Sequence, residues 1–120
     1  MQDWLFEFRA HVDMTTDWKS VFDEARLAYG RGDTQAAICL VSEAVAIARE
    51  SDVSWHHLQS ALCGAGLFHQ HCTHNYHEAL RCFRESHTIL AENIGAESRE
   101  ARSLFQHVED CQRELNEASD

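Results

Sequence analysis

The sequence predicts an all-α protein, and three observations carry this prediction. The chain has no proline and only five glycines in 120 residues, so helix breakers are scarce. No segment alternates strictly between apolar and polar residues with β-branched enrichment, as a half-buried strand would. Apolar residues recur instead at spacings of three and four, which is typical of amphipathic helices.

Five amphipathic helices joined by short turns are expected, with a shorter one before them. The short helix covers residues 3–12, where Trp4, Leu5 and Phe8 share a face. The five main helices are predicted over about residues 18–30, 34–50, 54 into the histidine-rich stretch, 76–93 and 98–116. Glycine-containing turns such as Gly-Arg-Gly-Asp separate them. Short connections indicate antiparallel neighbours, either in a closed bundle or in a stack of hairpins.

The gross composition limits the classes of function. A chain of 120 residues with 44% apolar residues is long enough for one domain, residues 1–120, with a real core. The formal charge is −10, from 20 acidic and 10 basic residues. Nucleic acid and anionic membranes are therefore disfavoured as partners, because both require a basic surface. A basic partner would be attracted.

Nothing in the sequence predicts a membrane span or a secretory signal. No apolar run approaches the roughly 18 residues that a transmembrane helix needs. The segment Met-Gln-Asp-Trp-Leu-Phe-Glu-Phe at the N-terminus is too acidic for a signal peptide. The five cysteines are an odd number without a framework spacing, which favours reduced thiols in the cytoplasm.

Two segments can be superposed at a fixed offset of 42 residues. They begin at Gly32 (GDTQAAICLVSEAVAI) and at His74 (HNYHEALRCFRESHTI). The matched pairs are Ala37 with Ala79, Ile38 with Leu80, Val41 with Phe83, Ala44 with Ser86, and Ile47 with Ile89. Small and large apolar residues that recur at one period indicate stacked helical hairpins.

These segments resemble the tetratricopeptide repeat. That family has a short Gly-Asp turn followed by Tyr-x-x-Ala-hydrophobic, and AYGRGDTQAAI and HNYHEAL hold these places here. The period of 42 is similar to the long variant of kinesin light chains, although the family's helix-ending proline is missing. The resemblance implies a short right-handed superhelix of about two and a half repeats, at 18–50, 54–93 and a capping helix at 98–116. The turn of the second hairpin is about three residues too long, at His71–Thr73.

The stretch HQHCTHNYH, residues 69–77, raises the question of a metal site. The weak metal candidates are His71, Cys72, His74 and His77, because some of them have helical spacing and Cys/His ligands suit zinc. The stretch contains no CxxC or HExxH motif, so the favoured interpretation is a turn between two helices, without metal or cofactor. No nucleophile with an orienting partner appears either, and we predict no enzymatic activity. His56 and His57 are expected to be exposed in the first turn of a helix.

The resemblance also implies a concave groove, lined by the first helix of each repeat, that binds a partner peptide or helix. The candidates for this groove are Lys19, Phe22, Arg26, Tyr29, Ala61, Ala65, Phe68, His69, Arg102, Phe105 and Glu109. The apolar segment around Trp4 could cap the stack, fill the groove or make a dimer, and capping is favoured. The first helices lack the Lys/Asn clamp of the chaperone-tail binders.

The sequence therefore predicts a protein–protein interaction module, or adaptor, for a basic or amphipathic segment of another protein. Two alternatives stay open. One is a small dedicated assembly or secretion chaperone. The other is a histidine-rich regulator that responds to metal or pH, since protonating nine histidines would take the formal charge from −10 to −1. A homodimer and membership of a longer repeat array are also left open.

Overall fold

The computed structural model describes residues 17–51 and 54–119 of the chain. These ranges form five α-helices and one short π-helix, without any strand, which confirms the all-α prediction. The short helix expected over residues 3–12 lies outside the described residues. The chain divides into two compact units, residues 1–48 and 49–120, and each is described by itself. The expectation of a single domain stays a prediction.

The first unit contains the hairpin of α2 (Trp18–Gly30) and most of α3 (Thr34–Glu50). Both helices have the limits that the sequence predicted. Asp17 caps α2 by accepting a hydrogen bond from the backbone N–H of Lys19. In the turn, Gly32 has a φ of 86°, a left-handed conformation that favours glycine. The buried residues of the hairpin are Val21, Phe22, Ala25, Ala28, Ala37, Val41, Ala44 and Ala48.

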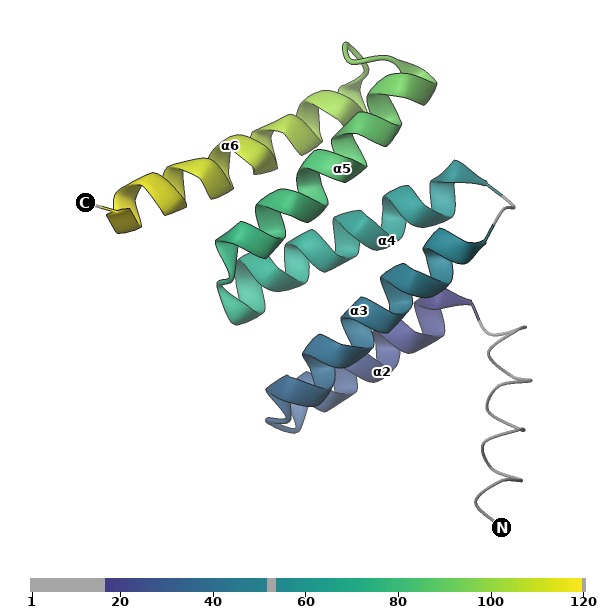
Figure 1. The fold of residues 1–120 in the computed structure, drawn as a ribbon, viewed down its shortest axis with the longest axis vertical. Helices are drawn as coiled ribbons and strands as arrows, with labels where there is room; N and C mark the ends of the chain where they lie inside the picture. Colours follow the sequence, from purple (N-terminus) through teal and green to yellow (C-terminus); the bar gives the residue numbers. More distant parts are fainter. Residues whose placement is uncertain (1–16, 52–53, 120) are drawn as a thin grey trace. The chain divides into compact units, whose positions relative to one another are not determined.

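The second unit contains α4 (Trp55–Phe68), the π-helix η1 (His69–Thr73), α5 (Tyr76–Ile94) and α6 (Arg99–Ser119). Helix α5 lies in the middle and packs against both α4 and α6 (Figure 1). A core cluster between α5 and α6 consists of Ala79, Leu80, Phe83, Leu90, Ala101, Leu104, Val108 and Cys111. Ser98 caps α6 by accepting from the N–H of Ala101 at 3.2 Å. No helix within the described ranges is long and apolar enough to cross a membrane.

Two contacts fix the approach of α5 to α4. A Cβ atom at Gly66 would lie 2.6 Å from the ring of Phe83, so glycine is what allows this ring to pack against the helix. Further along, Ser86 is fully buried, and its hydroxyl is satisfied from both sides. It donates to the carbonyl of Gln59 and accepts from the Gln59 side-chain amide, both at 3.0 Å.

The 42-residue offset seen in the sequence is also present in the geometry. Asp33 and Asn75 both cap the following helix, each accepting from the N–H three residues later. The residue before each cap, Gly32 or His74, has a left-handed backbone conformation. The pairs Ala37/Ala79, Val41/Phe83 and Ala44/Ser86 are fully buried. The second helices of the two hairpins, α3 and α5, are therefore equivalent in capping and in burial.

The first helices of the two hairpins, α2 and α4, match each other at a different offset. Their buried positions pair as Val21/Ala61, Phe22/Leu62 and Ala25/Ala65, which is an offset of 40 residues. The second hairpin therefore contains two more residues than the first between these helices. The π-helix at His69–Thr73 lies in this interval, directly after α4. Because a π-helix makes i→i+5 hydrogen bonds, it takes up additional residues in a turn without ending the helix. The sequence prediction of about three extra residues in a loop is thus corrected to two, accommodated in helix.

Candidate functional site

The histidine-rich stretch, residues 69–77, forms the junction between α4 and α5, and one of its histidines, His69, is buried. His69 is only 6% exposed. Its Nδ1 lies 3.0 Å from the hydroxyl oxygen of Thr73, four residues later in the π-helix. The ring of Phe68 meets the His69 ring edge-on, with centroids 5.3 Å apart. The sequence prediction that His69 lines a groove is wrong, because its side chain is buried.

Burial lowers the pKa of His69, because the charged imidazolium loses its hydration. Two charged side chains on the first turns of α5 modify this effect in opposite directions. The carboxylate of Glu78 raises the pKa of His69, and the guanidinium of Arg81 lowers it. Glu78 and Arg81 form an ion pair with each other. His69 is therefore held neutral by its surroundings.

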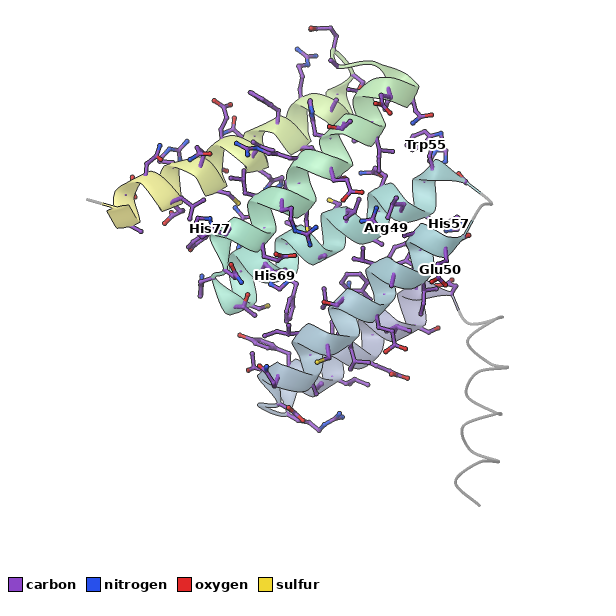
Figure 2. The ribbon with its side chains drawn as sticks, in the orientation of Figure 1. Arg49, Glu50, Trp55, His57, His69 and His77 are labelled. Carbon is purple, nitrogen blue, oxygen red and sulfur yellow. The ribbon has the colours of Figure 1, made fainter. Side chains whose placement is uncertain are left out.

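The structure does not assemble the weak metal candidates into a ligand set. His71, His74 and His77 are exposed and Cys72 is half-buried. His74 instead places its Nδ1 3.2 Å from the hydroxyl of Tyr76. Over residues 17–51 and 54–119, no three His, Cys, Asp or Glu side chains come together as a metal site would require. Figure 2 shows His69 and His77 at the junction of α4 and α5, and Trp55 and His57 at the opposite end of α4.

The groove candidates of the first unit are partly on the surface. Lys19, Arg26 and Tyr29 are exposed on α2. Phe22 is buried and meets the ring of Trp18 edge-on, with centroids 5.8 Å apart. Its side chain belongs to the core of the chain, so it does not line an open groove.

The groove candidates of the second unit are separated by the structure. Ala61, Ala65 and His69 are buried, and Phe68 is half-buried. Because a fully buried methyl group offers no surface to a partner, Ala61 and Ala65 act in packing. On α6, Arg102 is exposed, while Phe105 and Glu109 line a hollow shared with α5. The candidates from α4 and α6 therefore do not share one surface.

A different set of residues lines a trough between α4 and α6, the two helices that pack on either side of α5 in the second unit. Gln59 and Cys63 form the α4 side, and Leu90 and Leu104 contribute apolar surface. The α6 side consists of Arg99, Glu100, Ser103 and His107. We call this surface the α4/α6 trough. The sequence did not predict these residues, because a spacing of four, as at 59/63 and 99/103/107, occurs on every face of a helix.

Two side chains of the trough have unusual surroundings. The imidazole of His107 stacks on the buried ring of Phe83, with centroids 4.9 Å apart and planes inclined by 17°. The Nδ1 atom of His107 is buried and has no hydrogen-bond partner within the described part of the chain. Burial raises the pKa of the Cys63 thiol, so this group stays neutral near pH 7. Because the thiolate is the nucleophilic form, burial disfavours nucleophilic chemistry at Cys63.

Comparison with protein-family models, with curated proteins and with solved structures found no match for this chain.

Proposed function

We propose that this chain is a helical-repeat interaction module, similar to tetratricopeptide domains, that binds a segment of another protein in the α4/α6 trough. The observation that carries the proposal is that α4 and α6, which pack on either side of α5, bound an open trough with an apolar floor and polar walls. Such a surface suits a peptide or an amphipathic helix, whose apolar side chains pack on the floor while polar groups meet the walls.

The internal repeat supports the same proposal. Equivalent caps, left-handed turn residues and buried positions recur in the two hairpins, as expected of stacked repeat units. In that arrangement α6 is the terminal helix of the stack. It carries the exposed charges Arg113, Glu114 and Glu117, which would keep a capping helix solvated.

The proposed partner segment is basic or amphipathic. The formal charge of −10 attracts cationic segments at long range. Within the trough, the Glu100 carboxylate can accept from a lysine or arginine of the partner, while Leu90 and Leu104 offer apolar contacts. Binding would require shape and hydrogen-bond complementarity, without any covalent step.

Affinity capture from an extract of the native cells, with a matched pair of variants, tests this function. Ser103→Trp fills the trough with an indole, whereas Gln106→Trp places the same indole on an exposed site of α6 outside the trough. Proteins identified by mass spectrometry with the wild type should persist with Gln106→Trp and be lost with Ser103→Trp. Equal capture by both variants would exclude the trough as the binding surface. Capture of nothing above background would argue against an interaction module.

The alternative of a dedicated chaperone stays a prediction. The alternative of a pH-responsive protein is favoured by one specific observation, the buried and neutral His69 at the junction of α4 and α5. It concerns the stability of the second unit and is compatible with binding in the trough.

A further inference from the structure

A second hollow lies between α5 and α6 and shares no residue with the α4/α6 trough. Its volume is about 440 Å³. Arg84, His87 and Thr88 form the α5 side, and Phe105, Val108 and Glu109 form most of the α6 side. We call it the α5/α6 hollow. Since α6 contributes different faces to the two surfaces, occupation of one leaves the other open.

We propose that the α5/α6 hollow joins two copies of this chain across a twofold axis. A twofold interface requires each copy to carry both halves of every contact on one surface. The hollow meets this requirement in shape. Phe105 is 50% exposed at the hollow, with its ring centroid 5.7 Å from that of His87, so an aromatic side chain and an open cavity occur together. The Phe105 ring of each copy can enter the hollow of the other.

The hollow also carries one basic and one acidic residue, which can pair between two copies across the twofold axis. Arg84 lies on the α5 side, and its guanidinium is tied to the far end of the hollow by a hydrogen bond to Gln112 at 3.2 Å. Glu109 lies on the α6 side. When two hollows face each other across a twofold axis that runs along the seam between α5 and α6, α6 of one copy lies over α5 of the other. Glu109 of one copy then comes opposite Arg84 of the other, and this pairing occurs twice. An unrelated partner would have to supply both charges and an apolar group in matching positions.

This pairing also explains how a strongly acidic chain could associate. Two copies, each with a formal charge of −10, repel one another at long range. Two Arg84–Glu109 contacts around an apolar centre would offset this repulsion locally. The dimer would leave the α4/α6 trough available, so the inference does not depend on the proposed function of the trough.

The decisive experiment is a charge-reversal exchange followed by sedimentation equilibrium. The single variants Arg84→Glu and Glu109→Arg each place like charges opposite one another twice in their own dimer. In a mixture of the two variants, both contacts of the mixed dimer pair opposite charges again. We expect the wild type and the equimolar mixture to approach 27.4 kDa, twice the 13.7 kDa of one chain. Each variant alone should stay near 13.7 kDa at the same concentration, with a dissociation constant raised roughly tenfold or more.

Circular dichroism checks that every variant folds. A second pair of variants tests the apolar part of the contact. Phe105→Ser should weaken the dimer, whereas Leu67→Ser, at a 36% exposed apolar residue of α4 outside the hollow, should not. A wild type that stays monomeric at millimolar concentration overturns the proposal, and so does a mixture that stays monomeric. Dimerisation that is unaffected by Phe105→Ser and by both charge reversals places the contact elsewhere and overturns it as well.

Discussion

Acidification should destabilise the second unit through His69, and the effect can be isolated with one substitution. His69 is buried, its Nδ1 faces Thr73, and its pKa is lowered by the loss of hydration. In the unfolded chain it titrates near the ordinary histidine value of about 6.5. The unfolded state therefore binds a proton at a higher pH than the folded state does. The stability contributed by neutral His69 is complete above pH 6.5 and is lost as the pH falls below that value.

The magnitude follows from proton linkage. Between the unfolded and the folded pKa of one group, the free energy of unfolding falls by up to about 1.4 kcal/mol for each pH unit. For a domain of this size, a loss of 1 kcal/mol lowers the melting temperature by about 4 °C or more. Glu78 titrates in a different range, because its pKa is lowered by the hydrogen bond from Arg81. Its contribution is present above the ordinary glutamate value of about 4.3 and is lost only as the pH falls below it.

The assay is differential scanning calorimetry between pH 7.5 and 5.0 on the wild type, His69→Gln and His71→Gln. Glutamine at position 69 can still bond to Thr73 but does not titrate. His71→Gln removes an exposed histidine from the same π-helix and serves as the control. The wild type and His71→Gln should lose stability below pH 6.5 with the same slope, and His69→Gln should be less sensitive. If His69→Gln retains the full slope of the wild type, the burial of a neutral His69 is refuted as the cause.

Three further substitutions test the packing and capping of the helices by urea denaturation. Gly66→Ala should destabilise the protein by about 1–3 kcal/mol, because the new methyl group would overlap the ring of Phe83, whereas Gly30→Ala, with nothing within 4 Å of its Cβ position, should not. Asn75→Ala should cost about 1 kcal/mol by removing the cap of α5, and no loss would mean that the Asn75–Glu78 bond of 3.3 Å does not form. Arg49→Ala breaks a two-bond ion pair to Glu85 that is largely open to water, so a loss above about 1 kcal/mol would contradict this description.

The helices could be predicted from the sequence because local signals determine them. The limits of α2 and α3 follow from the cap at Asp17 and the turn with Gly32. The start of α5 at Tyr76 agrees with the predicted range of 76–93, and Asn75 caps it. These features depend on a residue and its neighbours within one turn, where propensity and capping rules apply. The repeat shared by α3 and α5 could be recognised in the sequence for the same reason.

The candidate site could not be predicted to the same extent, because it depends on how the helices rotate against each other. Ala61 and Ala65 lie on a helical face that the sequence alone allows to be either groove or core, and packing buries them. The π-helix has no distinct composition, so its additional residues were predicted as an enlarged turn, about three residues too long. The close approach of Phe83 to Gly66 could not be predicted either, because these residues are 17 positions apart in sequence and lie on different helices.

Hydrogen–deuterium exchange of the chain, with and without the partner captured from the native extract, shows directly whether the partner binds in the α4/α6 trough. We expect binding to protect two segments that line the trough, residues 59–63 of α4 and 99–107 of α6. The backbone of α2 should show no comparable change. Protection confined to α2 and α3, or to residues 84–88 of α5, would contradict the assignment of the trough as the binding surface.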